Sequence, residues 1–272
     1  GGVVPNAKSD VVIAGGDSVY TLVGGVCNNL TLYNGGIFAT SVDTVGVAST
    51  LTLEDGSTFY NKTTNPRVPG QERILEPNST VVHSGSGTVG GVGNDVFGNL
   101  VIQRAEGCTP ATNLLIQGNL IINNSANNVV FRGARPPTTG SQTHTVLGDV
   151  HVLKGILSCI DVGDNAMSCI WNIEGSVYVT DAGNNRDARI GPFSSANASG
   201  LGIFNIGGDL IINGGRLQAG TSSTSGPGTG IINLSGNLVL SSTSAVATNS
   251  LGPFALNFVG NGIQTVSSQI HF

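Results

Sequence analysis

The chain has 272 residues, which is long enough to bury a core of its own, and 39% of them are hydrophobic. Only 10% are charged and the net charge is −5, without a run of Lys or Arg, so the composition argues against a disordered chain and against nucleic-acid binding. No apolar stretch is long enough to cross a bilayer as a helix, so we expect no transmembrane segment. The 41 glycines, with frequent Asn, Ser and Thr, favour short strands joined by turns.

The expected strands are short apolar runs between turn residues, and they begin near the N-terminus at residues 10–13 and 18–22. Further strands before and after the central repeats are expected at 30–32, 37–39, 51–53, 81–82, 99–103, 256–258 and 263–266. Long loops, rich in Pro, Gly and polar residues, are expected at 61–71, 108–112, 132–142 and 184–200.

One phrase, Gly-Asn/Asp/Ser-Leu/Val-x-Ile/Val/Leu, recurs through the middle and the end of the chain. It begins at Gly98, Gly118, Gly148, Gly175, Gly208 and Gly236. These glycines follow one another at intervals of 20, 30, 27, 33 and 28 residues. A turn and strand that recur at an irregular interval are typical of a solenoid whose coils carry loops of different length. We therefore predict an all-β fold, a single-stranded right-handed parallel β-helix (β-solenoid) of roughly ten coils, as one domain spanning residues 1–272.

Alternation within each phrase predicts which side chains face the core of the stack. The inward pairs would be Leu100/Ile102, Leu120/Ile122, Val150/Val152, Val177/Val179, Leu210/Ile212 and Leu238/Leu240. The residues between them would face outward, namely Val101, Ile121, His151, Tyr178, Ile211 and Val239. This outward row is more apolar than solvent requires, which indicates cover by loops, a ligand or a partner.

The segment Leu256-x-Phe258-x-Gly260-x-Gly262-x-Gln264-x-Val266, preceded by the Gly-Asn-Leu-x-Leu phrases, carries a resemblance. It resembles the repeats of large secreted bacterial cell-surface proteins with adhesin-like parallel β-helix regions, many of them cargo of the type IX secretion pathway. The likeness covers most of the chain as a style of repeat and includes no catalytic motif. It implies an extracellular or cell-surface location and a parent protein that continues past Phe272. The partners it implies are other domains of that parent, cell-surface components or polysaccharide.

Because no catalytic motif accompanies the repeats, we expect a structural or adhesive segment that acts as a stiff spacer or an interaction surface. The first alternative is a β-helical polysaccharide lyase or glycoside hydrolase, with its site in the polar region that contains Asp161, Asp181, Asp187 and Arg189. Glycosidase chemistry would need two carboxyl groups about 5 to 9 Å apart. The competing interpretation, which we favour, is that these residues satisfy backbone groups in turns.

The second alternative is a carbohydrate-binding region without catalysis. Such regions present exposed aromatic rings that pack on the apolar face of a sugar. The candidates are Trp171, Tyr178 and His151. Trp171, the only tryptophan, would be either a core residue or a lone stacking platform.

The four cysteines, Cys27, Cys108, Cys159 and Cys169, include no C-x-x-C pair, which argues against a zinc ribbon or a redox dithiol. Cys159 and Cys169 flank a turn-like Gly-Asp-Asn, and they would form a disulfide in a secreted protein or else remain buried thiols. The four histidines lack metal-ligand spacing, so we expect no metal and no cofactor. The alternative is a calcium site among the Asp and Asn turns, which lacks support because the glycine-rich nonapeptide of calcium-loaded β-rolls is missing.

Overall fold

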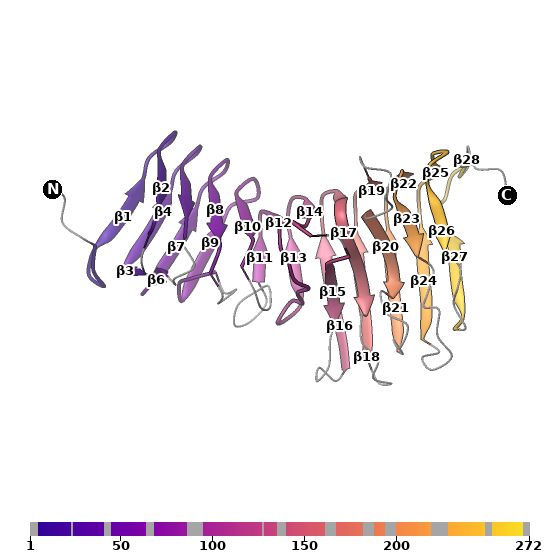
Figure 1. The fold of residues 1–272 in the computed structure, drawn as a ribbon, viewed down its shortest axis with the longest axis horizontal. Helices are drawn as coiled ribbons and strands as arrows, with labels where there is room; N and C mark the ends of the chain where they lie inside the picture. Colours follow the sequence, from indigo (N-terminus) through magenta and orange to yellow (C-terminus); the bar gives the residue numbers. More distant parts are fainter. Residues whose placement is uncertain are drawn as a thin grey trace.

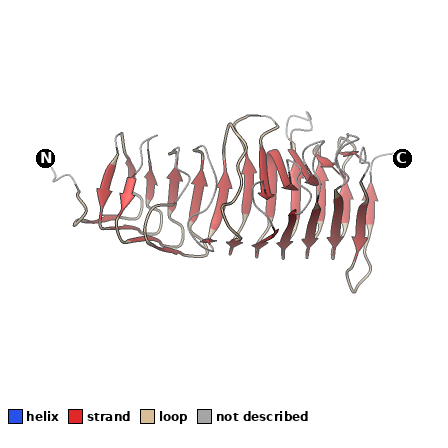
Figure 2. Ribbon diagram, turned by 90° about the horizontal axis from the view of Figure 1, so that it is seen from below, coloured by secondary structure: helices blue, strands red, loops and turns tan. Residues whose placement is uncertain are grey.

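The structure, a computed structural model, describes residues 5–22, 24–40, 45–63, 68–85, 95–126, 128–134, 140–160, 167–181, 188–193, 200–218, 228–247 and 252–268. Within these ranges the chain is all β, with strands along its whole length and no helix. The molecule is elongated, and its two termini lie at opposite ends (Figure 1). Seen from below, the strands lie next to one another in rows (Figure 2). The all-β prediction is confirmed, and this arrangement is compatible with a solenoid.

Two long sheets run along the molecule, and their hydrogen-bonded neighbours are far apart in sequence. The longest path contains eleven strands: β2 Ser18–Tyr20, β5 Ile37–Ala39, β8 Thr58–Asn61, β10 Thr80–His83, β12 Asn99–Ile102, β14 Leu120–Asn123, β17 Val150–Ile160, β19 Val177–Thr180, β22 Leu210–Asn213, β25 Leu238–Leu240 and β28 Val266–Ser268. The second sheet contains β11 Asp95–Phe97, β13 Leu114–Ile116, β16 Gly140–Val146, β18 Met167–Ile173, β21 Leu201–Ile206, β24 Thr229–Leu234 and β27 Phe254–Phe258.

The remaining strands form shorter rows beside these two sheets. A branch that starts at β17 contains β15 Val130–Ala134, β20 Ala188–Phe193, β23 Arg216–Gln218 and β26 Ala245–Ala247. The N-terminal half has a row of β1 Asp10–Ile13, β4 Asn29–Leu32, β7 Thr50–Leu53 and β9 Glu72–Leu75, and the pair β3 Gly25–Cys27 and β6 Val45–Val47. Each of these rows is also parallel, as the pairings of β1 with β4 and of β17 with β20 illustrate.

Two of the expected loops are partly wrong. Residues 188–193 within the expected loop 184–200 form β20, and β15 and β16 extend into the expected loop 132–142. Gly191 and Pro192 made the first of these segments look like a loop, because both residues usually interrupt strands. In the structure β20 lies between β17 and β23, which supply its ladder partners and override the local preference.

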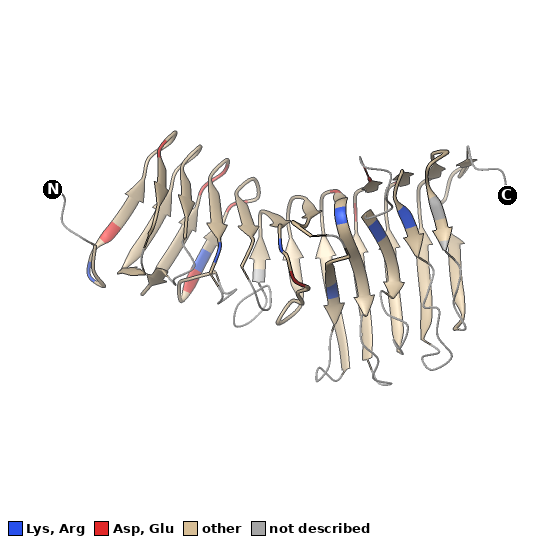
Figure 3. Ribbon diagram, in the orientation of Figure 1, with Lys and Arg blue, Asp and Glu red and all other residues tan. Residues whose placement is uncertain are grey.

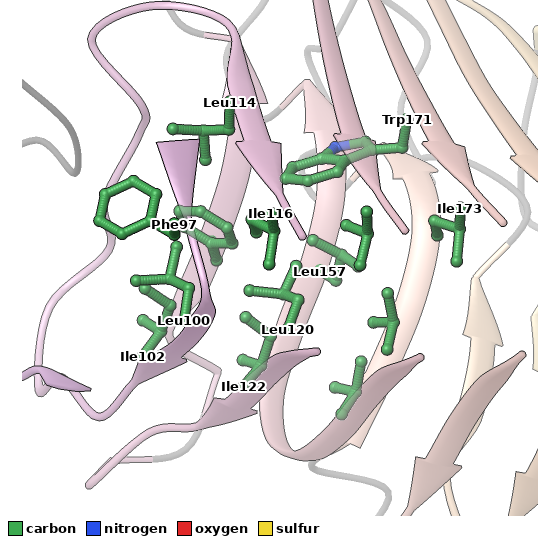
Figure 4. Packing of buried hydrophobic residues seen from close by; sticks show 14 of the residues in the cluster. Phe97, Leu100, Ile102, Leu114, Ile116, Leu120, Ile122, Leu157, Trp171 and Ile173 are labelled. Atoms are coloured by element: carbon green, nitrogen blue, oxygen red, sulfur yellow. The ribbon is translucent and has the colours of Figure 1, made fainter. Parts of the chain in front are cut away.

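The predicted facing of the repeated phrase is confirmed. All the inward side chains are buried, and the six outward ones are half-buried. Side chains from both long sheets meet in the core, where Leu100 and Leu120 of one sheet face the layer that contains Ile116 of the other (Figure 4). Burial of these apolar surfaces is the main stabilising term of the stack.

The phrase itself is a stacking unit, as the turn before β17 shows. The backbone N–H of Asp149 donates to Oδ1 of Asn119 in the preceding turn at 2.8 Å, and Oδ1 of Asp149 accepts the N–H of Ser176 in the next turn at 2.7 Å. A Cβ at Gly148 would overlap Oδ1 of Asn119, so the close approach that allows this bond requires glycine. The following apolar residue, Val150, enters the core, and Leu120, Val150 and Val177 are in register.

Candidate functional site

A groove of about 490 Å³ runs across β18, β21 and β24 on the outer face of the second sheet. Its polar lining includes the amides of Asn172, Asn205 and Asn233, and Val259 contributes an apolar edge. Asn172, Asn205 and Asn233 occupy equivalent, half-buried positions, because β18 pairs with β21 and β21 with β24 in unbroken register. The groove therefore follows the long axis of the stack rather than a single strand.

The asparagines form a hydrogen-bonded ladder across the four strands. Nδ2 of Asn205 donates to Oδ1 of Asn172 at 2.8 Å, and Nδ2 of Asn233 donates to Oδ1 of Asn205 at 2.8 Å. Nδ2 of Asn257 on β27 continues the series to Oδ1 of Asn233 at 2.9 Å. The amides consequently share one orientation, with all their dipoles aligned along the stack.

Asn205 and Asn233, the two middle residues of the ladder, each have a donor and an acceptor that the ladder does not use and that a ligand could reach. An asparagine side chain has two N–H donors and two acceptor lone pairs, and the ladder uses one of each at Asn205 and Asn233. The second N–H and the second lone pair of each amide remain, repeated at the spacing of neighbouring strands, about 4.8 Å. The groove thus presents a regular row of alternating donors and acceptors, which suits a polymer that carries hydroxyl groups.

Charge plays a small part in this groove. Glu174, which is exposed, is the one carboxylate among the described residues that line it. Hydrolysis of a glycosidic bond by the usual mechanism needs two carboxyl groups, so the groove as described favours hydrogen bonding over catalysis. Charged side chains are sparse along the rest of the described molecule as well (Figure 3).

The structure describes two of the four catalytic candidates, Asp181 and Arg189. Asp161 and Asp187 lie outside the described residues. Asp181 is 7% exposed and follows β19, where its backbone N–H donates to the carbonyl of Asn213 at 3.0 Å. Arg189 is half-buried on β20 and lies in register with Ile156. The enzyme hypothesis for this region therefore stays a prediction.

The aromatic candidates are placed unfavourably for sugar stacking. Trp171 is 0% exposed, its Nε1–H donates to the carbonyl of Ser158 at 3.4 Å, and its indole points into the core (Figure 4). The stacking-platform alternative for Trp171 is therefore wrong, because a ligand cannot reach the ring. Alternation along the strand had left both facings open.

His151 and Tyr178 do lie on the outer face, but they stack on each other. Their ring centroids are 4.9 Å apart and the planes differ by 8°. Their register neighbours along the row are Ile121 and Ile211, so the ring faces point along the stack. A ligand laid on this face would meet ring edges rather than the faces that usually pack on sugars.

Cys159 and Cys169 are buried free thiols in the structure, and each shifts the pKa of the other. Burial raises the pKa of Cys159, and the interaction with Cys169 raises it further. At Cys169 burial also acts to raise the pKa, but the interactions with Cys159 and His144 outweigh it and lower the pKa to about 7. The N–H of Leu114 donates to Nδ1 of His144, and Nε2 of His144 lies 3.0 Å from the carbonyl oxygen of Gly133.

A second hollow, of about 310 Å³, lies at the N-terminal end of the stack. It is almost wholly apolar, and its lining includes Val11, Leu22, Val26 and Phe38. Leu22 is 88% exposed beside the open edge of β2. An open strand edge with apolar side chains can pair with a further β-strand.

Sequence reasoning missed the asparagine ladder, although the sequence carries a signal for it. Asn172, Asn205 and Asn233 each lie three residues before a glycine of the repeat series, at Gly175, Gly208 and Gly236, and Asn257 lies three residues before Gly260. Because equivalent positions of successive repeats stack, a recurrent Asn at one position predicts an amide ladder.

No protein-family model matches the chain, and neither a curated protein nor a solved structure matches it. Among the described residues, no group of three or more His, Cys, Asp or Glu side chains is arranged to hold a metal ion. The same part of the chain contains no helix with the length and apolar character of a membrane span. Function is therefore inferred from the stacking, the ladders and the groove.

Proposed function

We propose that the chain is a single-stranded right-handed parallel β-helix of roughly ten coils that serves as a structural or adhesive segment of a secreted bacterial cell-surface protein. Its role is that of a stiff spacer that also offers an interaction surface. The observation that supports this most is the parallel path of eleven strands from β2 to β28. Side-chain hydrogen bonds between successive turns accompany this path, such as those from Asn119 to Asp149 and from Asp209 to Asn237.

Stiffness follows from this arrangement. Bending the stack would stretch the backbone hydrogen bonds and the side-chain bonds of many neighbouring rungs together, and would open the close-packed core. Ten spacings of about 4.8 Å give the path a length of about 50 Å. Open strand edges at the ends support other β-rich domains of the same parent protein as partners.

Distances between spin labels along one row test the spacer. Tyr20→Cys on β2 is paired with Val101→Cys on β12 or with Ser267→Cys on β28, and the four native cysteines are buried and should not be labelled. We expect narrow distributions near about 20 Å for the first pair and about 50 Å for the second, apart from the length of the label arms. Broad distributions, or a second distance similar to the first, would refute a stiff stack.

A second function is favoured by the amide ladder, namely carbohydrate binding without catalysis. The row of unused donors and acceptors at Asn205 and Asn233 runs along the axis, so a linear polysaccharide would lie along the groove. Screening on a glycan array, followed by calorimetry with each glycan retained on it, would identify binding. Asn205→Ala and Asn233→Ala should weaken binding at least tenfold, the effect of losing about 1.4 kcal/mol.

The matched control is Asn213→Ala, an exposed asparagine on β22 that does not line the groove. Equal loss of binding in the control and ladder variants, with all three folded, would place the ligand elsewhere. A depolymerisation assay on the same glycans separates binding from the enzyme alternative, since release of shorter products would show hydrolysis or elimination.

A further inference from the structure

We infer that Cys159 and Cys169 form an intramolecular disulfide that ties β17 to β18 across the core. Both side chains are fully buried, and they face the same layer between the branch that contains β20 and the second long sheet. Sγ of Cys159 points toward the second sheet, since it donates to the carbonyl of Ile203 on β21 at 3.4 Å. The two thiols also shift each other's pKa, as sulfur atoms that lie close together do.

The surrounding backbone leaves room for this pair. Gly202 is the register partner of Cys169 on the next strand, and a Cβ there would lie 3.1 Å from Cβ of Cys159. On the other side, a Cβ at Gly133 would overlap Sγ of Cys169. Two glycines therefore clear the space that the two sulfur side chains occupy.

Chain connectivity favours this pairing over the others. Cys159 and Cys169 are ten positions apart, so closing the loop between them costs little entropy. Cys27 lies on β3, and its thiol donates to the carbonyl of Gly46. The backbone of Cys108 forms an isolated parallel β-bridge with that of Phe131, and its thiol interacts with Arg104. These interactions of Cys27 and Cys108 are with residues other than cysteine.

Oxidation balances with a small disulfide, such as glutathione disulfide, as the oxidant. One cysteine thiolate attacks a sulfur of glutathione disulfide and releases one glutathione thiolate, which leaves a mixed disulfide. The second cysteine loses its proton to water and attacks the protein sulfur of that mixed disulfide, which releases the second glutathione thiolate. Both protein thiols are thereby oxidised and one glutathione disulfide is reduced to two glutathiones. Because the sulfurs are sealed in the folded core, this step occurs during folding, before the stack closes.

Counting thiols after refolding tests the inference directly. The protein is refolded in a glutathione redox buffer or in dithiothreitol, acid-quenched, and alkylated while unfolded. We expect two alkylated cysteines per chain from the glutathione sample and four from the reduced sample, because the sequence has four in total. Cys159 and Cys169 fall on one tryptic peptide, residues 155–186, so the bond appears as a loss of two hydrogens from that single peptide.

Thermal melting supplies the second readout. The wild type refolded with glutathione should melt several degrees above the wild type refolded with dithiothreitol. This difference should vanish in Cys159→Ala/Cys169→Ala and persist in the control Cys27→Ala. Each variant is compared with itself under the two refolding conditions, so a cavity left by alanine lowers both melting temperatures and does not affect their difference. Four alkylated cysteines after oxidative refolding, or a bond that maps to another pair, would overturn the inference. The disulfide in the cell rests on the proposed secreted location, whereas the refolding experiment does not.

Discussion

Gly133→Ala is the sharpest test of the packing around Trp171. Gly133 lies on β15, and a Cβ added there would overlap Sγ of Cys169 and lie 2.8 Å from Nε1 of Trp171 and 3.2 Å from Cδ2 of His144. Ordinary contacts between such atoms are about 3.5 to 4.0 Å, and all three neighbours are fully buried. The methyl group can be accommodated only if several packed side chains move together.

Overpacking of this kind costs about 1 to 3 kcal/mol, and three simultaneous contacts place Gly133→Ala near the upper end. Replacing a strand glycine by alanine also stabilises by about 0.5 to 1 kcal/mol through the unfolded state, so we expect a net loss of about 2 kcal/mol. Guanidinium unfolding followed by the fluorescence of Trp171, the single tryptophan, measures this loss. The matched control is Gly25→Ala on β3, where a Cβ would meet nothing within 4 Å, and which should be neutral or slightly stabilised.

Equal unfolding free energies for Gly133→Ala and Gly25→Ala would refute this account of the core. The double variant Gly133→Ala/Cys169→Ala extends the test, because removal of the sulfur relieves one of the overlaps. A double-mutant cycle should then show a favourable coupling of about 1 kcal/mol, and strict additivity would show that the sulfur is not the obstacle.

Three further predictions concern separate parts of the stack. Leu210→Asp, which buries a carboxylate in the core, should abolish the cooperative melt, and a retained melt would contradict the inward assignment of Leu210. Asn205→Ala should lower the free energy of unfolding by about 1 kcal/mol in urea, and Asn213→Ala by less, because only the former interrupts the ladder. Burial and the nearby Arg104 lower the pKa of His83 to about 3. Between about pH 6.5 and pH 3 the unfolded chain therefore binds more protons than the folded chain, so the free energy of unfolding should fall as the pH falls, by up to about 1.4 kcal/mol per pH unit. Urea melts at a series of pH values measure this slope, and His83→Gln should flatten it.

The sequence was sufficient for the six strands of the long row that carry the phrase, β12, β14, β17, β19, β22 and β25, because the phrase carries several constraints at once, whereas the strand expected at 263–266 lies instead at Val266–Ser268. The glycine, the turn residue and the two inward apolar residues of the Gly208 phrase, for example, each have a separate steric or hydrogen-bonding reason. Such agreement among local signals is what makes a pattern reliable. The facing of Leu210 and Ile212 could therefore be predicted from alternation alone.

The branch that contains β15, β20, β23 and β26 could not be predicted, because its strands lack the phrase, and β15 and β20 also contain glycine or proline. In β20, Gly191 and Pro192 are compatible with a strand only because β17 and β23 lie on either side. The same limit applies to Trp171. Alternation gives two opposite facings and does not say which one is the core, and only the arrangement of the two long sheets decides it.

The irregular intervals between the repeat glycines explain how a groove and a stiff stack can coexist. The intervals vary from 20 to 33 residues, yet Leu100, Leu120, Val150, Val177, Leu210 and Leu238 remain successive register partners. The Asx hydrogen bonds and glycine contacts fix each phrase on the next, so additional residues are accommodated in the loops instead of shifting the rungs. Lengthening a loop beside the ladder should therefore change the walls of the groove while it leaves the spacing of Asn172, Asn205 and Asn233 unchanged. Under the proposed function, recognition and rigidity would thus be set by different residues of the same repeat.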